Sequence, residues 1–193
     1  MAKFFGNLHL VLVVGLLAAI AVMFGFRADV PIMHDWLFLW LHVFFGILWI
    51  GLLYYLNFVQ VPTMPSIPAE LKPAVTGYIA PKVFFFFRWS ALLTVLTGLT
   101  VAYLRGYVHR AMSFQGVNGH ENLIGLGMWL ALIMAFNVWF IIWPNQKKAL
   151  GIVTVSPEEK AAAAKMAGMT SRINTMLSIP MLYCMVAQQN GGL

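Results

Sequence analysis

The hydrophobic positions of the chain fall into five long stretches that shorter polar segments separate. A helix needs roughly 20 mostly apolar residues to cross the hydrocarbon core of a bilayer, and each stretch has about this length. We therefore predict an all-α, integral membrane helical bundle with about five transmembrane helices, forming a single domain over residues 1–193. The predicted spans are residues 7–26, 36–58, 83–104, 123–143 and 168–188.

The last span is predicted to continue a helix that begins outside the hydrocarbon. Ser156, Pro157 and Glu159 form the signature of a capping box with proline at the first helical position. The alanine-rich run that follows predicts a cytoplasmic helical extension over residues 157–168. Pro180 lies inside the span, where it should kink the helix or loosen its hydrogen-bond ladder.

Composition and charge support a membrane location and exclude several classes of protein. Hydrophobic residues make up 61% of the chain and charged residues 9%, too few to cover a soluble domain. The net charge of +6 lies in connectors, without the patches that would indicate a nucleic-acid partner, so we expect contact with membrane lipids. Seven lysines in alternate connectors oppose three arginines in the others, which predicts a cytoplasmic N-terminus and an exterior C-terminus.

His42 is the most unusual residue of the apolar stretches. Gly46 follows it by one helical turn, and imidazole is a usual axial ligand of haem iron, so a flat macrocycle could lie against this face. We identify His42 as a candidate metal ligand, and His42 with Gly46 as candidate cofactor-binding residues. The alternative is a neutral histidine hydrogen-bonded to a neighbouring helix, with Gly46 allowing close packing. A haem here would be five-coordinate or completed by His34 or His120.

Other polar residues in the spans have both structural and binding interpretations. Arg88 could reach lipid phosphate, or could bind an anion such as a haem propionate. Arg172 and Asn174 are further candidate cofactor-binding residues. Asn174 also belongs to a polar stripe that is typical of helix–helix contacts, for which Asn137 is the expected partner. No residue is assigned a catalytic role.

The single cysteine, Cys184, lies in an apolar run, and the chain has no CxxCH motif. A covalently attached c-type haem is therefore not expected, and neither is a disulfide framework. Any haem would be of the b type.

Several segments in order along the chain resemble a known family. "WLHVFFGILWIGLLYYLNF", "NVWFIIWPNQKK" and "SRINTMLSIPMLYCMV" resemble the membrane domain of the PuuD-type urate hydroxylases, also called the urate oxidase N-terminal domain. "FFRWSALLTVLTGL" resembles the family's third-helix pattern, and the similarity extends from roughly Trp36 to Val186. By resemblance, the family's functional positions correspond to His42, Arg88, Asn137, Pro144, Asn145, Gln146, Asn174 and Pro180.

The resemblance implies a bacterial inner-membrane protein associated with oxidation of urate to 5-hydroxyisourate. Longer members carry a cytochrome c domain and more spans, so this chain resembles a short form. Their last motif has histidines where this sequence reads "RINT" and "AQQN".

Two functions follow from these observations. The first is a haem b redox protein of the urate hydroxylase type, which oxidises urate or passes electrons to a cytochrome c or to quinone. The second is a non-catalytic accessory or scaffold subunit of a larger respiratory or photosynthetic membrane complex. A carrier of small anions is a weaker third, because the chain shows no inverted repeat.

Overall fold

The computed structural model describes residues 5–25, 35–119 and 121–190, and within these ranges the chain forms helices and connectors without any strand. It separates into two compact units, residues 1–33 and 34–193. The first unit contains α2 (Leu8–Gly25), where the Asn7 side chain accepts a hydrogen bond from the Leu10 backbone N–H at 3.2 Å. This helix confirms that the first apolar stretch is helical. A single domain over the whole chain stays a prediction.

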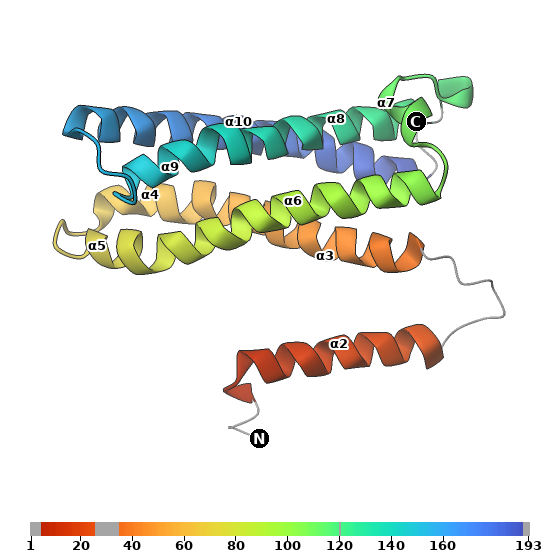
Figure 1. Ribbon diagram of the computed structural model, residues 1–193, viewed down its shortest axis with the longest axis horizontal. Helices are drawn as coiled ribbons and strands as arrows, with labels where there is room; N and C mark the ends of the chain where they lie inside the picture. Colours follow the sequence, from red (N-terminus) through yellow and green to blue (C-terminus); the bar gives the residue numbers. More distant parts are fainter. Residues whose placement is uncertain (1–4, 26–34, 120, 191–193) are drawn as a thin grey trace. The chain divides into compact units, whose positions relative to one another are not determined.

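The second unit consists of two helical hairpins, each made of two long antiparallel rods (Figure 1). The first rod of the first hairpin consists of α3 (Asp35–Tyr54), η1 (Tyr55–Gln60), α4 (Val61–Thr63) and η2 (Met64–Ser66). The second rod consists of α5 (Lys72–Ala74), η3 (Val75–Ile79) and α6 (Ala80–Leu104). The short α7 (Val108–Met112) and η4 (Val117–Gly119) lead to the second hairpin. Its rods are α8 (Asn122–Phe136) with η5 (Asn137–Ile142) and α9 (Trp143–Ala149), and α10 (Pro157–Gln189).

Three of these rods are long and apolar enough to cross a membrane: Asp35–Ser66, Lys72–Leu104 and Asn122–Ala149. The predicted number of about five is therefore met only loosely. In α2 the apolar part, Leu8–Val22, is shorter, and α10 begins with a polar, alanine-rich segment. Outward-facing side chains such as Ile47, Phe140 and Ile179 are about two thirds exposed, which suits contact with lipid better than contact with water.

Each of the three rods contains a π-helical segment immediately before a proline-bearing turn. Pro62, Pro81 and Pro144 stand in the first turn of the α-helical segment that follows η1, η3 and η5. Proline has no N–H to donate, and its ring collides with the carbonyl four residues earlier, so a locally widened helix accommodates it. For this reason the proline-rich segment 59–82, predicted as a connector, is helical except for residues 67–71.

The start of α10 agrees with the predicted capping box. Ser156 has an extended backbone, and its hydroxyl oxygen accepts a hydrogen bond from the Glu159 N–H at 3.2 Å, with Pro157 at the first helical position. The helix then runs without interruption through Pro180 to Gln189. The predicted extension 157–168 and span 168–188 are thus one continuous helix.

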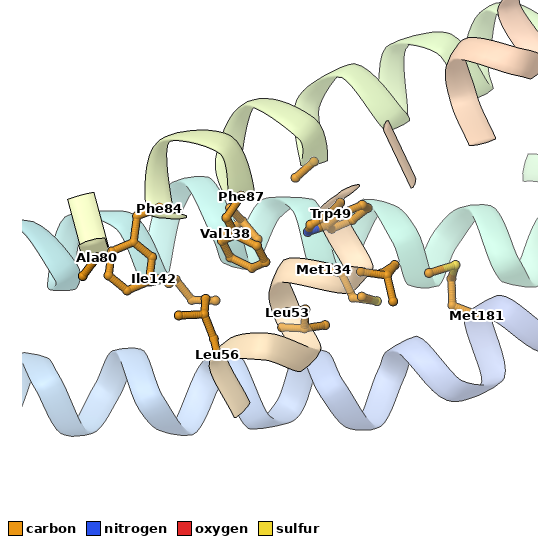
Figure 2. Close-up of a cluster of buried hydrophobic side chains, with 12 residues drawn as sticks. Trp49, Leu53, Leu56, Ala80, Phe84, Phe87, Met134, Val138, Ile142 and Met181 are labelled. Carbon is orange, nitrogen blue, oxygen red and sulfur yellow. The ribbon is translucent and has the colours of Figure 1, made fainter. Parts of the chain in front are cut away.

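The four rods of the second unit pack in a cyclic order. Helix α3 packs along α6, α8 packs along α10, and α6 and α8 and also α10 and α3 are in contact. Helices α3 and α8 therefore lie on one diagonal of the bundle. The apolar core between the rods includes Trp49, Leu53, Phe87, Met134 and Val138, all 1% exposed or less (Figure 2).

Glycine allows the second hairpin to pack closely. A Cβ atom at Gly127 of α8 would lie 2.9 Å from the Cβ of Cys184 in α10, a separation that real Cβ atoms do not show. The backbones of α8 and α10 can approach this far only because Gly127 has no side chain.

Candidate functional site

A cavity of about 360 Å³ lies in the second unit at the end that holds α7. Its walls come from α3, α6, α8 and α10, and residues near α7 line its mouth. Pockets of this size hold small organic ligands. Most of the lining is apolar, and its polar members include His42, Arg105, Tyr107, Arg110 and Gln188.

The hydrogen bond of His42 determines which of its ring nitrogens can bind a ligand. Nδ1 lies 2.8 Å from the Thr94 backbone oxygen, and a carbonyl oxygen can only accept, so Nδ1 carries the proton. In the neutral ring Nε2 is then unprotonated, with its lone pair available. No described residue forms a hydrogen bond with Nε2. Histidines that bind metals usually donate their other N–H to a carbonyl or carboxylate in this way.

Gly98 of α6 makes room for the His42 ring. A Cβ atom at Gly98 would lie 2.7 Å from Cε1 and 2.8 Å from Nδ1 of the imidazole. A Cβ at Gly46, by contrast, would make an ordinary contact of 3.8 Å with Cγ2 of Thr94. Gly46 therefore packs against α6. The glycine that contacts the imidazole is Gly98, which the sequence analysis did not identify.

Two ion pairs stand at the mouth of the cavity. Arg105 donates from Nε to Oδ2 of Asp35 at 2.7 Å, and the Asp35 side chain is only 3% exposed. Arg110 donates from Nε and Nη2 to Oε1 of Glu121 at 3.0 and 2.8 Å. The hydrogen bond from Arg110 lowers the pKa of Glu121, so this carboxylate stays ionised at neutral pH.

Donors remain free at the same mouth. Arg105 uses only Nε, so both of its terminal nitrogens lack a hydrogen bond to any described residue. Burial raises the pKa of Tyr107, against the opposing effect of the Arg105 charge, and the phenol remains a neutral O–H group. Together Arg105 and Tyr107 can bind the anionic edge of a ligand whose apolar part lies deeper in the cavity.

Arg88 does not line this cavity. Its guanidinium carbon lies 3.6 Å from the centre of the Trp143 ring, and its backbone oxygen accepts a hydrogen bond from Trp139 Nε1 at 3.1 Å. Nη1 is buried and has no hydrogen-bond partner among the described residues. The contact with Trp143 is a cation–π interaction within the bundle, and binding of lipid phosphate or another anion stays a prediction.

Arg172 and Asn174 also lie apart from His42. Arg172 is exposed on the outer face of α10, beside Lys165 and Gly168. Asn174 is fully buried: its Oδ1 accepts from Asn137 Nδ2 at 2.8 Å, and its Nδ2 donates to the Met134 backbone oxygen at 2.9 Å. The expected pairing of Asn137 with this stripe is confirmed.

The rest of the polar stripe joins the two hairpins. Asn57 Nδ2 donates to Ser171 Oγ at 2.8 Å, and the Tyr54 and Ser178 hydroxyls lie 3.0 Å apart. Its visible role is therefore helix–helix contact. Of the five residues predicted to bind a cofactor, the structure places only His42 on the cavity wall.

The donor set suits a haem better than a bare metal ion. The described residues contain no cluster of three or more His, Cys, Asp or Glu side chains, which a protein-bound metal ion would need. A haem iron needs only one or two protein ligands, and the unprotonated Nε2 of His42 has the chemistry of such a ligand. His34 and His120, the proposed additional ligands, lie outside the described residues. Met128 and Met185 also line the cavity.

Comparison with known proteins bears on the second hairpin. Residues 107–191 match the family model described as urate oxidase N-terminal. The match covers a little less than half of the chain, and this part is similar to the urate oxidase N-terminal family. The match supplies the α8 and α10 walls of the cavity and both members of the Asn137–Asn174 pair, and it begins after His42 and Arg88. No curated protein and no solved structure matches the chain.

Proposed function

We propose that the chain is a membrane redox protein related to the urate hydroxylases, and that its cavity would hold haem b through Nε2 of His42. The observation that carries this proposal is the hydrogen bond from Nδ1 to the Thr94 oxygen, which leaves Nε2 unprotonated and without a partner among the described residues. When bound, haem supplies one-electron transfer.

The residues around the cavity have distinct roles in this proposal. The Thr94 carbonyl fixes the tautomer of His42 and increases the basicity of the ring as a ligand. Gly98 allows the imidazole to lie flat against α6. Arg105 would hold a propionate with its two free terminal nitrogens, while Asp35 fixes the orientation of the guanidinium through Nε. The apolar walls keep water away from the group and so influence its reduction potential.

The similarity of residues 107–191 to the urate oxidase N-terminal family supports urate as the electron donor. Conversion of urate and one water molecule to 5-hydroxyisourate releases two electrons and two protons. The two electrons need an external acceptor, for which a cytochrome c or a quinone has suitable chemistry. An inner-membrane location in a bacterium, with the N-terminus in the cytoplasm, belongs to the same proposal.

An absorption spectrum of the detergent-purified chain tests the haem proposal. We expect a Soret band, with α and β bands on reduction, that is lost in His42→Ala and kept in His109→Ala. His109 is a suitable control because it is exposed on α7 and does not line the cavity. Membranes containing the chain should also consume urate when an active acceptor is present. A colourless protein that consumes no urate would contradict the proposal.

The second candidate function is a non-catalytic subunit of a larger membrane complex. It is favoured by the outer face of α10, where Gly168 and the flexible side chains Met169 and Met176 lie beside Arg172 without any covering element among the described residues of the second unit. It is also favoured by the structural use of Asn137 and Asn174. A colourless chain that co-purifies with a large complex would support this function and exclude the first.

A further inference from the structure

The cavity contains a second side chain able to bind a haem iron, on the helix diagonal to the one that carries His42. Met128 of α8 lines the cavity and is 9% exposed. Ligand sites in helical bundles are built from side chains on facing helices. The two axial ligands of a haem approach from opposite faces of the macrocycle, so their helices should lie across the bundle from one another. Helices α3 and α8 meet this condition.

The two side chains also lie at similar depth. His42 is seven residues into α3, and Met128 is six residues into α8. At about 1.5 Å per residue, they lie roughly 10 and 9 Å from the starts of their helices. Gly98, which touches the imidazole, precedes the end of α6 by six residues and so lies at a comparable level.

Met185 of α10 is the other methionine on the cavity wall, and it is less suited to this role. Its methyl carbon would lie 3.3 Å from a Cβ at Gly127, so this side chain packs against α8. Helix α10 is also a direct neighbour of α3 in the bundle rather than the helix across from it. A ligand from α10 would therefore approach beside His42 instead of opposite to it.

We propose that Met128 is the second axial ligand of a six-coordinate His42–haem–Met128 site. This inference rests on the proposed haem function and adds to it the identity of the distal ligand. It also explains how the chain can complete a haem site without a histidine in its last helix. A thioether ligand raises the reduction potential relative to a second histidine.

The test compares Met128→Leu with Met185→Leu in the full chain purified in detergent. Leucine has a similar volume to methionine and should be tolerated in the cavity wall. We expect Met128→Leu to keep its haem, to show a high-spin, five-coordinate signal, to bind carbon monoxide rapidly after reduction, and to have a lower midpoint potential. Met185→Leu should keep the low-spin signal and the potential of the unaltered chain.

Met128→His gives a second measurement if the leucine variant does not fold. The haem of this histidine variant should remain low-spin, should not bind carbon monoxide after reduction, and should have a lower midpoint potential than the haem of the unaltered chain. If Met128→Leu binds haem with an unchanged spin state and midpoint potential, the inference is overturned while the proposed function stands. The same holds if the spin state and potential change only in Met185→Leu. If the unaltered chain binds no haem, the proposed function fails, and this inference fails with it.

Discussion

The contact between Gly98 and His42 leads to the sharpest mutational prediction. In Gly98→Ala, the new methyl group would lie 2.7 Å from Cε1 and 2.8 Å from Nδ1 of the imidazole. Ordinary carbon contacts begin near 3.4 Å, so the ring must move by about 0.7 Å or the helices must separate. Nδ1 lies 2.8 Å from the Thr94 oxygen in the structure, and a movement of this size would weaken that hydrogen bond, which fixes the tautomer.

The expected change in the free energy of unfolding is the sum of three contributions, of which two destabilise the variant and one stabilises it. Overpacking a well-filled site costs about 1–3 kcal/mol, and weakening one hydrogen bond costs about 0.5–1.5 kcal/mol. Replacing a helical glycine by alanine returns about 1 kcal/mol. The net destabilisation should therefore be about 1–3 kcal/mol. If a similar energy is lost from ligand binding, haem affinity falls by roughly tenfold or more, because about 1.4 kcal/mol corresponds to a factor of ten.

The assay measures the haem-to-protein ratio and the thermal unfolding midpoint of purified Gly98→Ala, with two glycine variants of α3 as controls. Gly46→Ala meets only an ordinary contact with Thr94, and Gly51→Ala meets nothing within 4 Å. Both control variants should keep the haem content of the unaltered chain, and their thermal unfolding midpoints should be equal to its midpoint or slightly higher. If Gly98→Ala behaves like these controls, or if Gly46→Ala alone loses haem, the geometry assigned to the His42 site is wrong.

Three further predictions concern the remaining contacts of the second unit. Asn174→Ala removes the acceptor of the buried Asn137 amide, so thermal unfolding should show a loss of about 1–3 kcal/mol, and an unchanged midpoint would contradict the proposed helix contact. Ser156→Ala removes the α10 cap and should cost about 1 kcal/mol, whereas Ser156→Asp should restore stability. The hydrogen bond from Arg110 lowers the folded-state pKa of Glu121 below its ordinary value of 4.5. The pair therefore stabilises the fold above pH 4.5, and this stabilisation is lost as the pH falls through the folded-state pKa. Unfolding midpoints measured from pH 7 to pH 3 should therefore fall less for Glu121→Gln than for the unaltered chain, and parallel curves would refute the assignment.

The helical architecture was largely predictable, because length and hydropathy are local properties of the sequence. The five apolar stretches and the Ser156 cap follow from local sequence, and the pairing of Asn137 with the polar stripe was expected because few polar side chains lie within the apolar spans. The continuation of helices through residues 59–82 was missed, because the π-helical segments that accommodate Pro62 and Pro81 have no recognisable sequence signal.

The site was predictable only in its central residue. His42 was conspicuous because an imidazole is unusual in an apolar stretch, and Arg88 and Arg172 attracted attention for the same reason. Arg105 and Arg110 lie in a connector, where arginine is ordinary, and only the hairpin topology brings them to the cavity mouth. Gly98 could not be paired with His42 from spacing, because the two residues belong to different helices and touch only in the packed bundle.

The haem content of the purified chain tests the central claim most directly. Extracted non-covalent haem should approach one molecule per chain for the unaltered protein and for His109→Ala, and should fall close to zero for His42→Ala while the variant keeps its helical circular dichroism. Equal haem content in a folded His42→Ala protein, or no haem in the unaltered chain, would contradict the assignment of His42 as an axial ligand.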